Sequence, residues 1–279
     1  MTAIRRAQVA GRFYPSDPEE LKLLIKQLAD KERAKVNFSL SEKTILGAIL
    51  PHAGHIYSGS ETVHFFEVLK SSKQVFDTWI IIHPLHNGSE TDYAAEDSEY
   101  WTTPLGSVRI DKDFISQMGI PVSKVAHVHE HSSEVILPFI QSYCENDFSF
   151  VSIGMARQNP VLARELSGAI VQAARSANKK ICLIASSDFS HYVRPEEGKM
   201  LDQKVLECIL RKDVSGIYDE VVDHQLSVCG YGPIMVLCAV LNTLHPEALP
   251  VVLSRGHSGE VHPSDSVVDY ISLLFYKNP

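Results

Sequence analysis

Imidazole side chains follow two predicted strands of the chain at the point where each strand ends. His52 comes soon after the apolar run 44–50, and His86 follows the run 75–82. Runs of this kind, rich in β-branched residues, are typical of buried strands. Because ligands collect beyond the carboxyl ends of the strands in open α/β sheets, we expect both imidazoles to face one crevice.

A carboxylate, a further histidine and a thiol add to this set. Asp188 and His191 follow a third predicted strand, 180–185, and Cys229 stands at the start of a helical segment. A helix start favours the thiolate form of cysteine, so we expect a lowered pKa for Cys229. Imidazoles and a thiolate suit iron, zinc or copper, and Asp188 and His191 have the chemistry to transfer protons beside such an ion. The same residues also fit loop side chains that only form hydrogen bonds.

Another group of histidines alternates along the chain: His127, His129 and His131. On an extended segment the three rings would share one face, which predicts either a second metal site or an exposed polar loop. No glycine-rich phosphate loop follows a predicted strand, and the sequence contains no serine nucleophile elbow. Nucleotide binding and the commonest serine hydrolase chemistry therefore find no support.

The elements that must position these residues alternate between strand and helix. Strands are predicted at residues 44–50, 75–82, 148–155, 180–185, 250–253 and 267–275. Helices are predicted at residues 60–70, 133–144, 160–177, 195–211 and 233–244. A further helix begins near Ser16, whose hydroxyl is expected to cap it, and Gly59 is expected in a tight turn. The alternation predicts an α/β fold with a sheet covered by helices on both faces.

The composition is that of a soluble globular protein. The 279 residues include 34 acidic and 26 basic side chains, a net charge of −8. Basic residues are not clustered, so nucleic-acid binding is not expected. No stretch has the length of a membrane span and the start lacks a signal peptide, so we expect a cytoplasmic protein without membrane contact. The five cysteines form no C-x-x-C pair, and the absence of linkers and repeats predicts one domain, residues 1–279.

Six motifs appear in order along nearly the whole chain. They are AQVAGRFYP at 7–15, PHAG at 51–54, PLH at 84–86, EHSSE at 130–134, SSDFSH at 186–191 and CGYGPI at 229–234. In this order they resemble the MEMO family. The resemblance implies a fold similar to that of the class III extradiol dioxygenases, a three-layer α/β/α sandwich around a central mixed sheet. In those dioxygenases two histidines and a glutamate hold a non-haem iron.

The resemblance also implies a role for each candidate residue. His52 and His86 fall on the two metal-ligand histidines, and Cys229 stands where the dioxygenases have a glutamate. Asp188 and His191 fall in the proton-relay region. A soft thiolate in place of a hard carboxylate alters the redox potential and the preferred metals. The expected cofactor is a divalent metal, iron before zinc or copper.

One position departs from the family pattern. His83 stands where relatives usually have glycine. Its extra imidazole is expected either to pack at the end of the strand, which is the preferred interpretation, or to donate a hydrogen bond near the metal ligands.

The leading functional hypothesis is a non-haem iron protein with redox chemistry on O2 or a small organic substrate. The resemblance implies a modification pathway with a radical-SAM protein and an AMMECR1-like protein as partners. Two alternatives stay open. One is a non-catalytic module that binds a peptide or protein in the same cleft, and the other is a zinc-dependent hydrolase.

Overall fold

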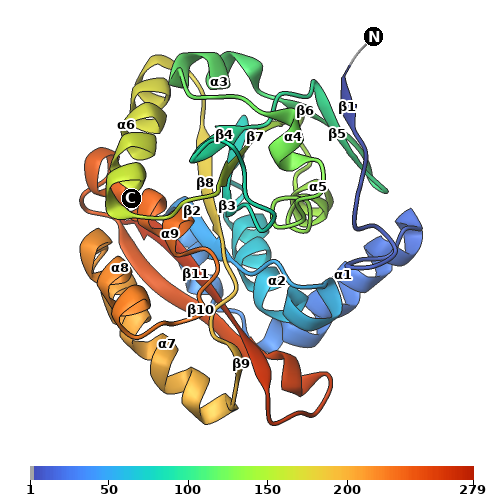
Figure 1. Cartoon of the computed structure of the whole chain (residues 1–279). Helices are drawn as coiled ribbons and strands as arrows, with labels where there is room; N and C mark the ends of the chain where they lie inside the picture. Colours follow the sequence, from blue (N-terminus) through green and yellow to red (C-terminus); the bar gives the residue numbers. More distant parts are fainter. Residues whose placement is uncertain (1–2) are drawn as a thin grey trace.

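A mixed sheet runs through the centre of the molecule (Figure 1). The computed structural model describes residues 3–279. The strands are β1 (Ile4–Arg5), β2 (Thr44–Leu50), β3 (Thr78–Pro84), β4 (Tyr93–Ala95), β5 (Tyr100–Thr103), β6 (Gly106–Ile110), β7 (Ser149–Met155), β8 (Ile181–Ser186), β9 (His191–Val193), β10 (Leu249–His257) and β11 (Val267–Lys277).

The helices are α1 (Pro18–Glu32), α2 (His55–Ser72), α3 (Lys112–Met118), α4 (Lys124–His127), α5 (Leu137–Tyr143), α6 (Pro160–Ser176), α7 (Pro195–Leu210), α8 (Val214–Asp223) and α9 (Tyr231–Leu244). Short 3₁₀ helices add η1 (Arg33–Lys35), η2 (Phe38–Glu42) and η3 (Ser258–Glu260).

The strand order is β1-β5-β6-β7-β3-β8-β2-β11-β10, with β4 beside β7 and β9 beside β11. Strands β6, β7, β3, β8 and β2 form a parallel block, in which β3 pairs with both β7 and β8. Strand β11 is antiparallel to both β2 and β10. The carboxyl ends of β2, β3 and β8 therefore lie at one edge of the sheet, where the loops carrying the predicted site begin.

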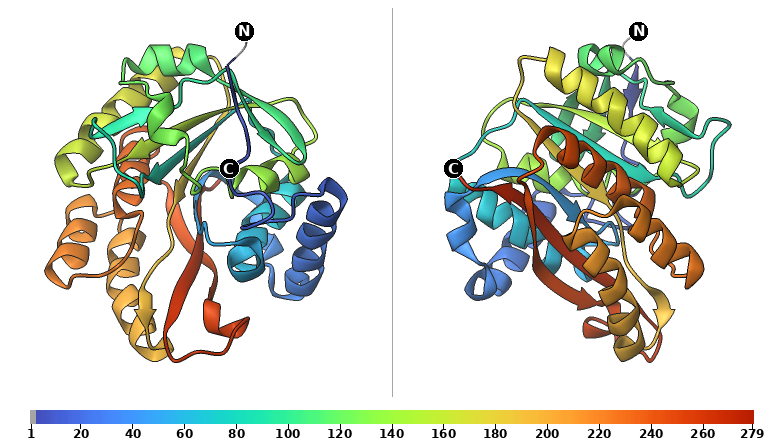
Figure 2. Two further views of the ribbon diagram at one scale, coloured as in Figure 1. Left: turned by 45° about the vertical axis from the view of Figure 1, so that its right-hand side comes forward. Right: turned by 90° about the vertical axis from the view of Figure 1, so that its left-hand side faces the viewer.

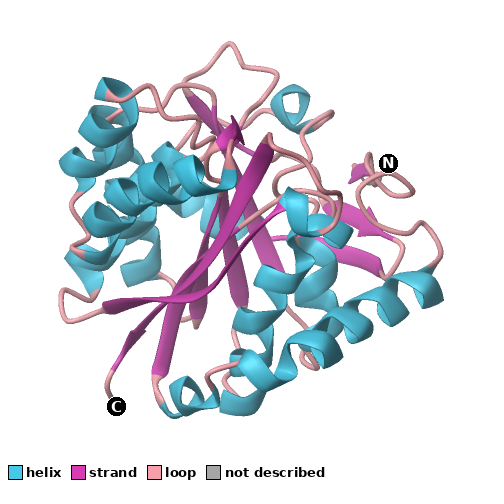
Figure 3. Ribbon diagram, turned by 90° about the horizontal axis from the view of Figure 1, so that it is seen from below, coloured by secondary structure: helices cyan, strands magenta, loops and turns pink. Residues whose placement is uncertain are grey.

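Helices cover the sheet on both faces (Figures 2 and 3). Helix α2 packs against α1 and α5 on one face. On the other face α9 contacts α6 and α8, which in turn contact α3 and α7. This arrangement confirms the predicted three-layer α/β/α sandwich with a central mixed sheet. In the described part of the chain, residues 3–279, no helix is both long enough and apolar enough to cross a membrane.

Aromatic side chains fill the space between the sheet and α2. Trp79 of β3 is fully buried, and its ring centroid lies 6.2 Å from that of Phe66. Phe66 in turn stacks on Phe139 of α5 at 5.8 Å. Burial of large rings dominates core energetics, and such ring pairs add about 0.5–1.5 kcal/mol each beyond the area buried. The apolar strand β3 is thus packed against α2 by these aromatic contacts.

The central strands match their predicted positions, and the differences lie at boundaries and short elements. Strand β2 has the predicted bounds, whereas β10 continues to residue 257 and α2 begins at residue 55. The elements that were not predicted are the strands β1, β4, β5, β6 and β9 and the helices α3, α4 and α8. Most of these have five residues or fewer, too few for a periodic pattern to stand out.

The cap of α1 differs from its prediction by one residue. Asp17, not Ser16, caps the helix, because the Asp17 carboxylate accepts hydrogen bonds from the backbone N–H groups of Glu19 and Glu20. A carboxylate at this position satisfies two free donors and also favours the positive end of the helix dipole.

Candidate metal centre

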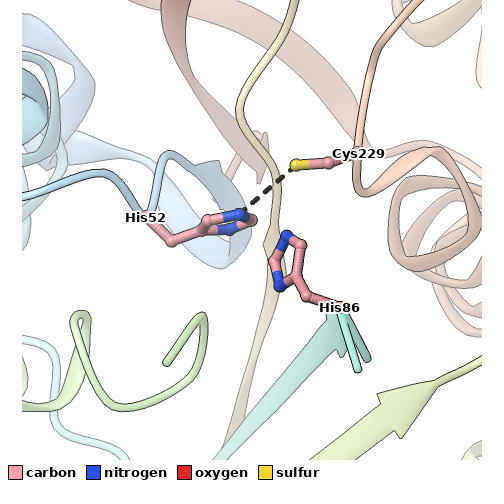
Figure 4. Close-up of side chains that lie close together, drawn as sticks. All are labelled: His52, His86 and Cys229. Carbon is pink, nitrogen blue, oxygen red and sulfur yellow. Dashed lines mark hydrogen bonds between the residues drawn. The ribbon is translucent and has the colours of Figure 1, made fainter. Parts of the chain in front are cut away.

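The structure brings His52, His86 and Cys229 together at the carboxyl edge of the sheet. His52 lies two residues after β2, His86 lies two residues after β3, and Cys229 lies just before α9. One nitrogen of each ring and the sulfur all lie within 4.8 Å of one another. Figure 4 shows the two rings and the thiol facing a common space. Distant segments of the chain therefore converge because the parallel strands end side by side.

His52 is buried and its ring is fixed by two contacts. Nδ1 lies 2.7 Å from Ser186 Oγ, and Nε2 lies 3.3 Å from Cys229 Sγ. The Ser186 hydroxyl donates its hydrogen to the carbonyl oxygen of Ser132, so it must accept from Nδ1–H. Burial, with the neighbouring His131 ring as the next cause, lowers the pKa of His52 well below its usual value. The neutral ring thus presents the lone pair of Nε2 to the cysteine.

His86 is held by the carboxylate of Glu130. Its Nδ1 lies 3.0 Å from Glu130 Oε1, and its backbone N–H donates to Oε2 at 2.7 Å. Burial alone would lower the pKa of His86, but the hydrogen bond to Glu130 and the charge of that carboxylate raise it. A carboxylate behind a histidine is the usual partner of metal-ligating imidazoles, because it fixes the ring and makes Nε2 more basic.

Glu130 is itself fixed by several donors. Its Oε1 accepts hydrogen bonds from the backbone N–H groups of His131 and Ser132 and from the Ser132 hydroxyl. Burial would raise the pKa of Glu130, but the hydrogen bond from His86 and the other nearby groups hold it well below its usual range. The buried carboxylate therefore stays charged beside the ring of His86.

Cys229 is partly buried between the loops that follow β2 and β8. Its sulfur accepts a hydrogen bond from the backbone N–H of Asp188 at 3.3 Å. Burial and the nearby Asp188 carboxyl raise the pKa of Cys229, which is opposite to the lowering expected from a helix start. Gly230, not Cys229, is the N-cap of α9. A Cβ on Gly230 would lie 2.3 Å from the Ser186 carbonyl oxygen, so only glycine lets this loop approach β8.

Asp188 and His191 occupy different positions around the centre. Asp188 is 5% exposed, and its Oδ1 accepts a hydrogen bond from the backbone N–H of His52 at 2.8 Å. Burial raises the pKa of Asp188 to about 6. His191 contacts Ser227 instead: its backbone N–H lies 2.7 Å from the hydroxyl oxygen and its Nδ1 lies 2.7 Å from the carbonyl oxygen. Asp188 thus touches two candidate ligands, whereas His191 is tied to the loop that leads to Cys229.

The alternating histidines do not share a face. His127 ends α4 and is fully buried, with Nε2 3.1 Å from the Ala94 carbonyl oxygen, while His129 is exposed. His131 stacks on His86 with a centroid distance of 4.7 Å. The prediction of one extended face is wrong because the segment folds as a short helix followed by turns. The three histidines therefore lie in three environments: His127 is buried, His129 is exposed and His131 lies beside His86.

His131 and Glu130 were missed as parts of the site. One nitrogen of His131, one oxygen of Glu130 and one nitrogen of His86 also lie within 4.8 Å of one another. The only sequence signal was the EHSSE motif, which carried the family resemblance without a role for its residues. The contact between the Glu130 carboxylate and His86 joins residues 44 positions apart, and no local sequence pattern can reveal it.

The donor set fits a divalent transition metal. Bond lengths of about 2.0–2.1 Å to nitrogen and 2.3 Å to sulfur place two tetrahedral ligand atoms roughly 3.5 Å apart. The Nε2 of His52 and the sulfur of Cys229 are 3.3 Å apart. Both histidines have Nδ1 engaged by an acceptor, so the lone pair of Nε2 on each ring is available to an ion. Two imidazoles and one thiolate suit iron, zinc or copper and leave a coordination position open.

Comparison with known proteins gives one family over nearly the whole chain. A sequence model described as Memo-like protein matches residues 5–274. A MEMO1 family protein of Methanosarcina barkeri is 33% identical over 275 residues, which cover 97% of this chain and 99% of the relative. A MEMO1 family protein of Saccharolobus solfataricus is 35% identical over 283 residues, with 97% and 99% covered.

Proposed function

The chain belongs to the Memo-like protein family, and we propose that it is a metal-binding protein that holds a divalent ion, with iron preferred, between His52, His86 and Cys229. The observation that carries this proposal is the convergence of the three ligand atoms within 4.8 Å. The ion would supply redox chemistry and Lewis acidity at the carboxyl edge of the sheet.

The residues around the ion have separate tasks in this proposal. Ser186 and Glu130 hold the two imidazoles with Nε2 directed to the common space. Asp188 fixes the loop that carries His52 by accepting its backbone N–H. The ring of His191 donates Nδ1–H to the Ser227 carbonyl oxygen, so the lone pair of its Nε2 can accept a proton from a substrate.

Metal content after anaerobic purification tests the proposal. We expect about one ferrous or zinc ion per chain, and much weaker binding in Cys229→Ser, because the thiolate is the one anionic ligand of the three and the main offset to the charge of the ion. Cys208→Ser and Cys238→Ser are the matched controls, since both thiols lie in helices and are buried. Equal metal affinity in wild type and Cys229→Ser would contradict the ligand assignment.

The same measurement separates the alternatives. A chain that retains no metal under anaerobic conditions would favour a non-catalytic module that binds a peptide or protein at the same edge of the sheet. A chain that retains zinc in preference to iron would favour a hydrolase, for which three protein ligands and one open position are the usual arrangement.

Partner proteins form a further part of the proposal. We propose a radical-SAM protein and an AMMECR1-like protein as companions, supported by membership of the family. Co-purification of the full-length proteins, measured with and without bound metal, tests this association. Failure to detect a complex both with and without metal would contradict the proposed association.

A further inference from the structure

Ser132 contacts the supports of both candidate ligand histidines. Its hydroxyl donates to Glu130 Oε1 at 2.8 Å, and that carboxylate oxygen accepts Nδ1–H of His86. Its carbonyl oxygen accepts the Ser186 hydroxyl at 2.9 Å, and the oxygen of Ser186 accepts Nδ1–H of His52. One fully buried residue thus stands behind both imidazoles, through two separate hydrogen-bonded arms.

His83 fixes the direction of the Ser132 hydroxyl. Its Nδ1 lies 3.0 Å from the carbonyl oxygen of Pro84 and 3.0 Å from Ser132 Oγ. Because a carbonyl oxygen only accepts, Nδ1 must carry the hydrogen. The other nitrogen, Nε2, lies 3.0 Å from Ser152 Oγ and accepts from that hydroxyl. With His83 as donor, Ser132 Oγ has its own hydrogen to give, and two acceptors lie near it: Glu130 Oε1 at 2.8 Å and the Pro84 carbonyl oxygen at 3.2 Å. The carboxylate is both closer and charged, so it is the stronger acceptor.

The environment of His83 keeps this arrangement in one form. The residue is fully buried in β3, three positions before His86. Burial, with His127 as the next cause, lowers the pKa of His83 to about 3, so the ring is neutral. A neutral ring with its hydrogen on Nδ1 has one donor and one acceptor, and both are used here. His83 therefore does more than pack at the strand end, which was the preferred interpretation of the sequence.

We propose that His83 and Ser132 form a positioning pair that sets the tautomer and orientation of His52 and His86 as metal ligands. The inference rests on the proposed function, because it concerns the same centre. Neither residue touches the ion. The pair acts through Glu130 on one ring and through Ser186 on the other, and removal of such outer hydrogen bonds typically costs about 10–100-fold in metal affinity.

Replacement of Ser132 tests the arm to His86. Ser132→Ala removes the hydroxyl and leaves the carbonyl, so we expect Co²⁺ and Fe²⁺ to bind about 10–100-fold more weakly. The absorption spectrum of bound Co²⁺ should shift, because His86 loses its fixed orientation. Ser133→Ala is the matched control, since that neighbour is equally buried and its hydroxyl has no hydrogen-bond partner in the described chain. Metal-free thermal unfolding of both variants checks that each is folded.

Replacement of His83 by two amides isolates its donor. Asparagine places an amide group near the position of Nδ1, whereas glutamine places it near that of Nε2. We expect His83→Asn to keep the metal affinity and the Co²⁺ spectrum, and His83→Gln to lose affinity as Ser132→Ala does. A side chain that only packs would give the same affinity in both variants. Ser186→Ala tests the arm to His52 independently and should weaken binding as well.

The outcomes distinguish the two levels of the proposal. Absence of Co²⁺ and Fe²⁺ binding in the wild type overturns the proposed function. Normal wild-type binding with equal affinity in Ser132→Ala and Ser133→Ala overturns the positioning pair alone. Equal affinity of His83→Asn and His83→Gln removes His83 from the pair.

Discussion

The hydrogen bonding of His191 distinguishes it from the candidate metal ligands. Nδ1 is engaged by the Ser227 carbonyl oxygen, and the ring does not belong to either group of side chains that could surround one ion. We therefore expect His191→Ala to keep wild-type metal content. If the protein turns over a substrate, the loss of a proton-transfer group should lower the rate by about 10²–10⁴-fold.

Metal stoichiometry of the purified variant checks this assignment, with Tyr192→Ala as a neighbouring control because that side chain is 80% exposed. Loss of metal from His191→Ala alone would make the histidine a ligand. Loss from both variants would instead indicate damage to the short strand β9.

The residues of the centre were only partly predictable. His52, His86 and Cys229 could be found because strand ends and helix starts leave local signals in the sequence. The supports behind the histidines could not. Ser186 Oγ meets Ser132 across 54 residues of chain, and His83 meets the same serine across 49. Nothing in the local pattern of a serine distinguishes such a contact from an exposed hydroxyl.

At the level of elements, the N-terminal segment is locked to the loop that carries Glu130. Arg5 of β1 is buried and donates to Glu134 Oε2 at 2.6 Å and to the carbonyl oxygens of Glu130 and His127 at 2.6 and 2.8 Å. The ion pair is 4% and 0% exposed. A short edge strand thus fixes the backbone on which the support of His86 lies.

Arg5→Met should destabilise the fold by about 3–5 kcal/mol, because it leaves the Glu134 carboxylate buried without its cation. Adding Glu134→Gln should recover part of that loss by removing the buried charge. Lys22→Met, which breaks the exposed pair with Glu19, should have little effect on unfolding by urea. Equal losses of unfolding free energy in Arg5→Met and Lys22→Met would contradict the idea that burial makes the Arg5–Glu134 pair important for stability.

A second buried ionic cluster joins α7, β10 and β11. Asp202 of α7 and Asp269 of β11 both contact Arg255 Nη2, at 3.0 and 3.2 Å. Asp202 Oδ1 also accepts hydrogen bonds from the backbone N–H and hydroxyl of Ser190. Burial and the neighbouring Asp269 carboxyl raise the pKa of Asp202 to about 7. Through Ser190 the cluster therefore anchors the loop after β8, with a carboxyl whose pKa lies above its usual value.

This raised pKa gives a pH dependence with a defined sign. An aspartate has a pKa of about 3.9 in the unfolded chain. The folded state therefore binds the Asp202 proton more tightly than the unfolded chain does. The stabilisation that this proton gives is fully present below about pH 4 and is lost as pH rises through about 7. Urea unfolding of wild type and Asp202→Asn should show the wild type losing stability relative to the variant across that range. Parallel curves would contradict the raised pKa.

Boundaries of the elements show where local patterns mislead. Gly59 was expected in a tight turn, yet it lies inside α2, where a Cβ would come within 2.6 Å of Leu28 Cδ1. The glycine is needed for the close packing of α2 on α1 and does not mark a turn, and the helix begins four residues before it, at His55. The reverse holds for β2, whose bounds were predicted correctly because nearly its whole run is buried between two helical layers.

For the molecule as a whole, the parallel block explains how separate loops form one centre. The loops after β2 and β3 carry His52 and His86, and Cys229 reaches the same edge from the segment before α9. In the described chain the loops after β2 and β3 are joined by hydrogen bonds through Ser186, Ser132 and Glu130. An ion bound between them would add a further link that exists only in the folded state. Metal binding and folding should therefore be coupled.

We expect added metal to raise the stability of the whole molecule. A ligand that binds only the folded state contributes about 2.7 kcal/mol when its free concentration is 100 times Kd. At about 2–4 °C per kcal/mol for large domains, the melting temperature of the wild type should rise by several degrees with Co²⁺. The rise should be retained in Cys208→Ser and largely lost in Cys229→Ser. An equal rise in all three proteins would place the stabilising ion elsewhere, because within residues 3–279 Cys229 is the one cysteine grouped with both histidines.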